Sequence, residues 1–425
     1  MCFSLHLAIL VLHLVGSDAH LAIDHKLSWK CHKPDLDWNV DYDDFEAAIK
    51  DLERNMSTPN LIQHWGYPVD SFDVRTRDGY ILELHHILGG RHEHGKHKKG
   101  KPAVFMQHGL LDSSFTWVAN LPHQSAGFIF ADAGFDVWLG NVRGNTYGRN
   151  GVDIHNDKFW NFSWDDMAKY DLPDMIDAVL EKTGQKNLTY IGHSQGTLIM
   201  FAKLAEDKEF ALKINKFLAL APVSTVAHIK GVASILSLPS RSILSKLTRP
   251  LSYLFEHSSW LRALSGEVCA IPLINKGCGK FATWVAGPDA SGQMNRTRMP
   301  VYVSHVPAGT SAKNIRHWIQ MINSKKMQKF EYSTDEENLK HYGQREAPVY
   351  DISKIATETH LFYSEKDWLA TYQDIKESIV RKTNPKFFKE HILQDFNHFD
   401  FVWGRRAADE IYKPIIRMLR PAIRI

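Results

Sequence analysis

The chain has 425 residues, of which 44% are hydrophobic, so it can bury a large core as two domains or as one domain with an insertion. Its 51 basic and 48 acidic residues give a formal net charge of +3, and neither half is strongly charged. This balance argues against a nucleic-acid-binding surface. The 23 histidines are an unusually high count, and they would add positive charge below a pH of about 6.5.

The first 19 residues have the features of a secretory signal peptide. An apolar run from Leu5 to Val15 is too short to span a bilayer, and the small residues Ser17 and Ala19 suit signal peptidase. The segment before this run contains neither Lys nor Arg, which leaves a buried N-terminal helix as the alternative. The rest of the sequence holds no apolar run of about 18 residues, so we expect a soluble mature protein.

Potential glycosylation sites and cysteines agree with a secretory route. Four Asn-x-Ser/Thr sequons are present, at Asn55, Asn161, Asn187 and Asn295. Asn187 starts a predicted strand and is the weakest of these candidates. Removal of residues 1–19 leaves Cys31, Cys269 and Cys278, and this odd number means one pair and one free thiol, or an intermolecular bond. Nearness in sequence favours a pair between Cys269 and Cys278.

The first predicted elements are two strands, Ser71–Thr76 and Tyr80–Ile87, which flank the hairpin signal Asp78-Gly79. The connector that follows, from Gly89 to Lys101, holds three histidines: His92, His94 and His97. No cluster of carboxylates or cysteines accompanies them, so we interpret the connector as a solvated cationic loop and not as a metal site. We expect the protein to need no metal and no organic cofactor.

Apolar strands and helices then alternate along the chain. The predicted strands are Ala103–Gln107, Phe135–Leu139, Asn187–Ile191 and Phe217–Ala221, and the predicted helices cover Trp164–Lys182 and the residues from Thr197 onward. Pro173 indicates a helix start, and Gly184 indicates a helix end. This alternation predicts an α/β fold with a mostly parallel sheet that is covered by helices on both faces.

The alternation stops between Ser224 and Tyr350, where helix-forming sequence is interrupted by prolines. It resumes with a strand at Thr357–Tyr363, a helix from Tyr372, a strand at Phe387–Leu393 and a terminal helix. We therefore interpret residues 224–350 as an inserted helical cap and lid. The core then has two parts, residues 20–223 and residues 351–425.

The pentapeptide Gly192-His-Ser-Gln-Gly196 lies between a predicted strand and a predicted helix. In this setting a Gly-x-Ser-x-Gly sequence forms a sharp, strained turn that projects the serine from the top of the sheet. The hydroxyl then lies near the N-terminus of the following helix, where a developing negative charge is favoured. We predict that Ser194 is a nucleophile.

A serine becomes nucleophilic when a histidine accepts its proton and a carboxylate orients that histidine. In such sheets the acid follows the next-to-last strand and the histidine follows the last one, which selects Asp367 and His398. The rival acids are Asp374, inside a helix, and Asp395, too close to the histidine in sequence to come from a separate strand end. The rival bases lie within strands and are His360 and His391.

The tetrahedral intermediate of acyl transfer needs two N–H donors. One is expected from Gln195, the residue after the nucleophile, and the other from the loop after an earlier strand. His108-Gly109-Leu110 is that loop, so the second donor is predicted to be the backbone N–H of Leu110. Gly109 permits a close backbone approach. His108 is expected to support the loop by hydrogen bonding, with a direct catalytic role as the alternative.

A set of motifs resembles those of the acid lipase family, to which lysosomal acid lipase and gastric lipase belong: Gln107–Leu111, Asp136–Asn145, Met167–Pro173, Gly192–Thr197, Ser304–Thr310, Lys366–Ala370 and Asn397–Phe401. The resemblance begins near His64 and extends nearly to the C-terminus. It implies an α/β-hydrolase fold with a helical cap and lid, and hydrolysis of triacylglycerols or cholesteryl esters at acidic pH.

Matched position by position, the resemblance implies a triad of Ser194, Asp367 and His398 and an oxyanion hole formed by Leu110 and Gln195. It also implies a cap disulfide between Cys269 and Cys278. The chain departs from the family at Ala370-Thr371-Tyr372, where relatives usually continue with Asp-Pro, so a helix-starting proline is missing. The connector Arg91–Lys101 is also longer and more basic than usual.

The cap sequence between Val226 and Phe255 contains no acidic residue. It carries four cationic residues among apolar residues at near-helical spacing: Lys230, Arg241, Lys246 and Arg249. One interpretation is a cap helix that covers the core and exposes its cations to water. The other is a lid whose apolar side meets lipid and whose cations favour anionic membranes.

The leading hypothesis is therefore a serine lipase that acts on neutral lipid at a lipid–water interface and contacts a membrane or lipid droplet transiently through its cap. A small-ester esterase or serine peptidase on the same fold is a second hypothesis, which the large apolar cap disfavours. A non-catalytic lipid carrier is a third, which the complete triad disfavours. We expect the lysosome lumen as the location, with secretion as the alternative; the oligomeric state does not follow from the sequence.

Overall fold

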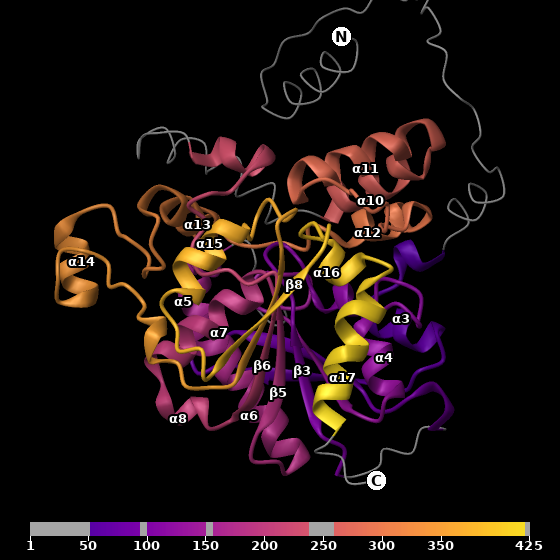
Figure 1. The fold of residues 1–425 in the computed structure, drawn as a ribbon, viewed down its shortest axis with the longest axis horizontal. Coiled ribbons are helices and arrows are strands. Elements are labelled where there is room, and N and C mark those ends of the chain that lie inside the picture. Colours follow the sequence, from indigo (N-terminus) through magenta and orange to yellow (C-terminus); the bar gives the residue numbers. More distant parts are fainter. Residues whose placement is uncertain (1–51, 94–99, 150–155, 238–258, 421–425) are drawn as a thin grey trace, which may run out of the picture. The chain divides into compact units, whose positions relative to one another are not determined.

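An eight-stranded sheet organises the part of the chain that the computed structural model describes, which is residues 52–93, 100–149, 156–237 and 259–420 (Figure 1). The expected signal peptide and Cys31 lie outside these residues. The strands are β1 (Val69–Arg75), β2 (Ile81–Ile87), β3 (Ala103–Gln107), β4 (Asp136–Gly140), β5 (Leu188–His193), β6 (Ile214–Leu220), β7 (Thr359–Ser364) and β8 (Phe388–Leu393). Their spatial order is β1-β2-β4-β3-β5-β6-β7-β8.

The sheet is mostly parallel, as the sequence predicts. β1 and β2 form the expected antiparallel hairpin, and β2 also runs antiparallel to β4. All later pairs are parallel. The central strands β3, β4, β5 and β7 are buried along their whole length, because helices cover both faces of a parallel sheet. Their carboxyl ends meet at one edge, where Gln107 of β3 pairs with Gly192 of β5.

Helices cover the two faces of this sheet. Their bounds are α3 (Thr58–His64), α4 (Ala126–Asp132), α5 (Trp164–Asp166), α6 (Leu172–Thr183), α7 (Gln195–Glu206), α8 (Lys208–Ala211), α15 (Tyr372–Ile375), α16 (Asp400–Trp403) and α17 (Lys413–Leu419). In Figure 1, α4 and α17 lie on one side of the sheet, and α6 and α7 lie on the other. Among the described residues, none of the helices combines the length and the apolar character that crossing a membrane requires.

The predicted helix over Trp164–Lys182 is present. It begins at Trp164, where Ser163 and Asp166 form a capping box. It passes through a π-helical segment, η4 (Met167–Asp171), before it reaches Pro173 in the first turn of α6. The predicted end at Gly184 is confirmed, since this residue has the left-handed φ of 68° that suits glycine at a helix terminus.

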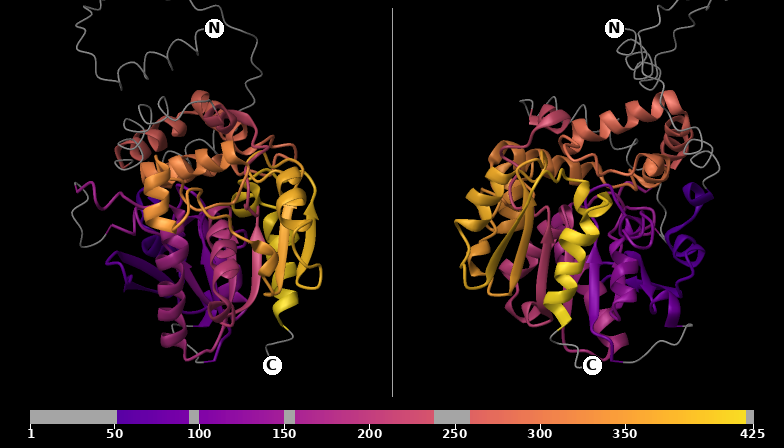
Figure 2. Two further views of the ribbon diagram at one scale, coloured as in Figure 1. Left: turned by 90° about the vertical axis from the view of Figure 1, so that its left-hand side faces the viewer. Right: turned by 45° about the vertical axis from the view of Figure 1, so that its right-hand side comes forward.

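The chain between β6 and β7 is helical, as expected for an inserted cap. It contains α10 (Ser259–Ala270), α11 (Pro272–Ala286), α12 (Met299–His305), α13 (Ala312–Ser324) and α14 (Asp335–Tyr342). Cys269 and Cys278 form a disulfide that joins α10 to α11. Figure 2 shows α10, α11 and α12 gathered over one end of the sheet. The boundaries at residues 224 and 350 stay a prediction.

The turn between β5 and α7 requires glycine at position 196. A Cβ atom there would lie 2.4 Å from the carbonyl oxygen of Gln107 and 2.9 Å from that of His108. The first oxygen belongs to the last residue of β3 and the second to the residue after it, so they cannot move away without disturbing the centre of the sheet. The absence of a side chain at Gly196 therefore lets the first turn of α7 rest directly on the end of β3.

We expect Gly196→Ala to lower the free energy of unfolding by about 3 kcal/mol or more, because overpacking against fixed backbone has no side chain to displace. Gly279→Ala is the matched control: Gly279 lies inside α11, and a Cβ atom there would meet nothing within 4 Å. That change should stabilise the protein by about 0.5–1 kcal/mol. Urea unfolding of both variants checks the prediction, and equal midpoints would contradict it.

Candidate active site

Three side chains from three strand ends form one chain of hydrogen bonds. The hydroxyl of Ser194, in the turn after β5, donates to Nε2 of His398 at 2.8 Å. Nδ1 of His398, in the loop after β8, donates to Oδ2 of Asp367, in the loop after β7, also at 2.8 Å. All three are buried, with exposed fractions of 6%, 3% and 0% for Ser194, His398 and Asp367. The structure thus brings together the three residues that the sequence selected.

The backbone of Ser194 is strained. Its φ of 53° and ψ of −118° lie in a region that residues with a Cβ rarely adopt. Hydrogen bonds on both sides hold it there: the Ser194 N–H donates to the Leu220 carbonyl at 3.1 Å, and the Thr197 hydroxyl donates to the Ser194 carbonyl at 2.7 Å. The turn therefore has the geometry of a nucleophile elbow.

The carboxylate of Asp367 is held by its own loop. Its second oxygen, Oδ1, accepts the backbone N–H groups of Leu369 at 2.8 Å and of Ala370 at 2.9 Å. One oxygen is thus used for orientation and the other faces His398. Because Asp367 is fully buried, this arrangement selects the tautomer of His398 whose Nε2 accepts the serine proton.

Helix α11 of the inserted segment connects the loops of the acid and the histidine. The carbonyl of Ala286, the last residue of α11, accepts the backbone N–H of His398 and that of Trp368, each at 3.1 Å. Gly287 follows with a φ of 112°, and a Cβ atom there would lie 2.1 Å from the carbonyl oxygen of Lys366. The two loops are therefore fastened to each other through the end of one cap helix.

The rival residues lie elsewhere and have other partners. The carboxylate of Asp374 accepts the backbone N–H groups of Ala227 and His228, at 3.1 and 3.0 Å, and so anchors the start of the insertion. Asp395 pairs with an arginine at the surface. The two histidines in strands, His360 and His391, hydrogen-bond each other at 3.0 Å. We therefore keep Asp367 and His398 as the candidate acid and base.

The loop after β3 lies directly against the nucleophile. A Cβ atom on Gly109 would lie 3.0 Å from the Cβ of Ser194 and 3.2 Å from Nδ1 of His193. Leu110 follows Gly109 directly, and Gln195 follows Ser194 at the first position of α7. Both expected oxyanion donors thus belong to backbone that borders the serine.

His108 supports this loop and is buried at 2% exposure. Its Nε2 accepts the backbone N–H of Val142 at 3.3 Å and the amide of Asn145 at 3.1 Å, so the proton is on Nδ1. Nδ1 in turn donates to the carbonyl of Gly109 at 2.8 Å. Burial lowers the pKa of His108 to about 4, so the ring stays neutral in mild acid. This geometry agrees with the supporting role that the sequence indicated.

A second histidine, His193, was missed by the sequence analysis. Its Nε2 donates to the backbone carbonyl of His398 at 3.0 Å, and the two rings lie 4.9 Å apart. Burial, and the nearby His398, hold the pKa of His193 well below its usual range, so its ring is neutral. The one available signal was its place directly before the serine, which a single sequence does not distinguish from ordinary core packing.

Asp400 is a buried carboxyl two residues after His398. Its Oδ2 accepts the backbone N–H of Asn397 at 2.8 Å, whereas Oδ1 has no partner among the described residues. Burial is the largest influence on this group and, with the charges of Asp289 and Asp367, raises its pKa to about 7. Asp400 is therefore protonated at acidic pH and becomes a buried charge near neutrality.

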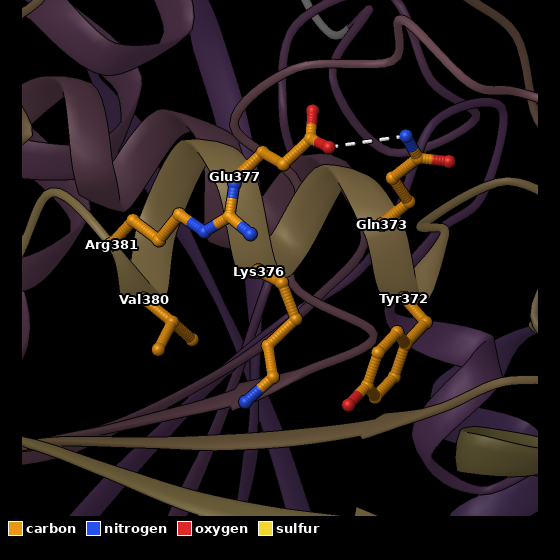
Figure 3. A pocket seen from close by; sticks show the side chains of 6 residues that line it. All are labelled: Tyr372, Gln373, Lys376, Glu377, Val380 and Arg381. Carbon is orange, nitrogen blue, oxygen red and sulfur yellow. Dashed lines mark hydrogen bonds between the residues drawn. The ribbon is translucent and has the colours of Figure 1, made fainter.

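A hollow on the surface of α15 lies apart from these residues. Figure 3 shows its lining, which comes from one helical stretch: Tyr372, Gln373, Lys376, Glu377, Val380 and Arg381. Two of the polar groups there already have partners, since Gln373 donates to Glu377 at 3.1 Å and Lys376 donates to Glu390 at 2.7 Å. None of the three hydrogen-bonded site residues lines it, so we assign it no catalytic role.

The remaining predicted positions lie at the surface or in the cap. The side chains of Asn55, Asn161 and Asn187 are exposed, and Asn295 is half-buried in the cap. Thr371 takes the place of the missing proline, because its hydroxyl accepts the Asp374 N–H and caps α15. Within the described ranges, His, Cys, Asp and Glu side chains do not gather in any group of three that could hold a metal ion.

Comparisons with known proteins show relatives of this chain. Residues 58–121 match a family described as a partial alpha/beta-hydrolase lipase region, and residues 102–405 match the alpha/beta hydrolase fold family. Lipase lipl-1 of Caenorhabditis elegans is 47% identical over 380 residues, which cover 87% of this chain and 93% of that protein. Human gastric triacylglycerol lipase is 40% identical, with coverage of 86% and 92%. Human lysosomal acid lipase/cholesteryl ester hydrolase is 39% identical, with coverage of 87% and 92%.

We expect Asp400→Asn to weaken the pH dependence of stability. Because the folded-state pKa of Asp400 is raised above its unfolded value, its contribution favours folding below about pH 4 and is lost as pH rises toward 7. Between pH 5.0 and 7.5 this loss is a few kcal/mol in the wild type and is absent in the asparagine variant. Urea unfolding at both pH values measures it, and an unchanged difference between the two pH values would contradict the prediction.

Proposed function

This chain belongs to the α/β-hydrolase-fold lipases, and we propose that it hydrolyses carboxylic esters of neutral lipids, namely triacylglycerols, cholesteryl esters or both, through an acyl-enzyme on Ser194. The observation that carries the proposal is the buried chain of hydrogen bonds from Ser194 through His398 to Asp367. A lipid carrier with this fold would have no use for it.

The proposed reaction follows from the contacts of the three side chains. Nε2 of His398 accepts the hydroxyl proton of Ser194 as the serine oxygen attacks the ester carbonyl carbon. The backbone N–H groups of Leu110 and Gln195 stabilise the resulting oxyanion. The intermediate then expels the alcohol, which takes the proton from His398 and leaves an acyl-serine. Water attacks the acyl-serine by the same route, which releases the fatty acid and restores Ser194. Asp367 orients the imidazole and stabilises its positive charge.

We propose acidic conditions for this reaction and the lysosome lumen as its location, with secretion as the alternative. The name of the human lysosomal acid lipase relative supports the first choice, and that of the gastric lipase relative supports the second. The exposed sequons at Asn55 and Asn161 suit glycosylation on either route. The neutral state of the buried Asp400 in acid also favours a protein that works at low pH.

The surface that meets lipid is proposed to be an apolar patch on the cap, called here the α11 patch. Two of its side chains lie one turn apart on α11, Phe281 at 59% and Trp284 at 61% exposure. Three further apolar side chains are exposed around this helix. Ile271 directly precedes α11, Leu264 lies on α10, and Val232 lies in the helical turn at residues 231–237; both of these elements contact α11. Exposed aromatic rings at this density mark a binding surface. Lys276 and Lys280 are exposed on the same helix and would favour anionic lipid.

The place of the α11 patch favours a lipid surface over a second copy of the chain. The helix that carries it ends at Ala286, whose carbonyl bonds the loops of Asp367 and His398. A lipid surface held there would present ester directly beside the site. The lid hypothesis from the sequence stays a prediction: Lys230 is exposed, and Arg241, Lys246 and Arg249 lie outside the described residues.

Ser194→Ala is expected to lower kcat by a factor of about 10⁴ or more, because the variant lacks the nucleophile. Wild type and variant are assayed on trioleoyl glycerol, cholesteryl oleate and a short p-nitrophenyl ester from pH 4 to 8. Activity on the short ester alone would favour a small-ester esterase. Equal rates for the two proteins on all three substrates would refute an enzymatic function.

Phe281→Ser/Trp284→Ser is expected to reduce hydrolysis of emulsified triacylglycerol by about tenfold or more, since each exposed ring contributes roughly 1.5–3 kcal/mol when it is buried in lipid. Hydrolysis of a soluble short ester should be unchanged. Leu212→Ser is the control, because Leu212 is 77% exposed next to α8 and away from the cap. Equal losses on both substrates would contradict the proposal, as would a change from dimer to monomer in sedimentation.

A further inference from the structure

One stretch of the cap, residues 308–318, makes hydrogen bonds next to one proposed oxyanion donor and to the side chain of the other. At its start, the backbone N–H of Ala308 donates to the carbonyl of Leu111 at 2.6 Å, one residue after Leu110. At its end, α13 reaches the side chain of Gln195. The two donors come from separate strand ends, so a single segment that contacts both is well placed to set their spacing.

The contact with Gln195 is specific. Its side-chain oxygen accepts two hydrogen bonds, from the amide of Asn314 at 3.0 Å and from the indole N–H of Trp318 at 2.8 Å. Its amide nitrogen lies 3.5 Å from the sulfur of Met167. Gln195, Asn314 and Trp318 are buried, at 2%, 0% and 8% exposure. Since Asn314 and Trp318 are four residues apart, they lie on the same face of α13.

Helix α13 is itself fixed to the core. The Asn314 side-chain oxygen accepts the backbone N–H of Trp164 at 2.8 Å, and the hydroxyl of Ser311, which caps the helix, donates to the carbonyl of Phe162. The start of α13 is thus tied to the segment that leads into α5. Gln195 is therefore held by a helix that is itself a stationary part of the hydrogen-bonded core.

A stationary support matters because the peptide between Ser194 and Gln195 follows a strained residue. A strained conformation persists only where the surroundings hold both sides of it. Hydrogen bonds to Leu220 and Thr197 hold Ser194 itself. The direction of the Gln195 N–H also depends on where the Gln195 side chain is held. An oxyanion donor must point at the position of the developing charge to be effective.

We infer that Asn314 and Trp318 are positioning residues for the oxyanion hole: they hold the side chain of Gln195 and thereby fix the direction of its backbone N–H. The inference rests on the proposed ester hydrolysis and names the part of the cap that supports it. The cap then has a second task beside covering the site. It is part of the structure that stabilises the transition state.

Trp318→Phe tests this inference because it removes one N–H donor and keeps an aromatic ring. We expect kcat on a soluble p-nitrophenyl ester to fall about tenfold, a part of the 10²–10³ that a missing donor costs. KM should stay within about twofold, since the lost interaction acts in the transition state. Hydrogen exchange of the peptide around Gln195 should become faster, a readout that does not depend on activity.

Trp138→Phe is the matched control. It also removes a buried indole hydrogen bond, from Trp138 to Asp136 at 2.8 Å, but in β4 and without contact to the turn at Ser194. It should lower the unfolding midpoint about as much as Trp318→Phe, since a buried hydrogen bond contributes roughly 1 kcal/mol in both places. It should leave kcat and the exchange around Gln195 unchanged.

A double-mutant cycle separates positioning from general damage. Gln195→Met keeps the backbone N–H and the side-chain length but removes the acceptor of both Trp318 and Asn314, so it should lower kcat at least as much as Trp318→Phe. The double variant Gln195→Met/Trp318→Phe should be no slower than Gln195→Met alone, because the hydrogen bond that Trp318→Phe removes is already lost in Gln195→Met.

Two results would overturn the inference on its own: an active wild type with kcat unaltered in Trp318→Phe, or effects that multiply in the double variant. A wild type no more active than Ser194→Ala would instead overturn the proposed function and the inference together. The two failures are therefore distinguishable in one set of assays.

Discussion

The site depends on one constraint, the strained backbone of Ser194 at the end of β5. Its positive φ is possible only because the groups around it leave no alternative: Leu220 on the neighbouring strand, Thr197 in the next turn, and the Gln107 carbonyl against Gly196. The sheet supplies this rigidity. Buried parallel strands end at a common edge, and that edge carries the serine, the loop of Leu110 and the loop of Asp367.

The cap belongs to the site as well as covering it. The last carbonyl of α11 joins the loops of Asp367 and His398, Ala308 bonds the loop of Leu110, and α13 holds Gln195. Each contact uses a backbone group or a buried amide, which are geometrically demanding partners. The inserted residues therefore determine positions in a core that precedes and follows them in sequence. This connection places the proposed lipid-binding surface on α11 close to the proposed catalytic residues.

Burial keeps several titratable groups around the candidate site uncharged in acid. His108 and His193 are kept neutral by burial, so their hydrogen bonds to the Gly109 and His398 carbonyls persist as the pH falls. Burial also raises the pKa of Asp400 and so favours its neutral, protonated form. Both kinds of shift have one cause, since a water-excluded interior disfavours charge of either sign. A water-excluded interior suits an apolar substrate, and the same exclusion of water determines the protonation states of the buried groups near the candidate site.

Much of the fold and of the candidate site could be predicted from the sequence. The alternation of apolar strands and helices, the Gly-x-Ser-x-Gly turn and the order serine, acid, histidine are local or one-dimensional patterns, so they predicted the sheet and selected Ser194, Asp367 and His398. The helix predicted over Trp164–Lys182 is present, but its capping box at Ser163 and its π-helical segment before Pro173 were not predicted. Contacts such as Asn314 and Trp318 with Gln195, or Ala286 with two loops, join residues more than 80 positions apart and involve backbone groups that every residue possesses. No pattern along the chain distinguishes such contacts from ordinary packing. The sequence determined which chemistry is present, and only the tertiary structure decided how the cap holds that chemistry in place.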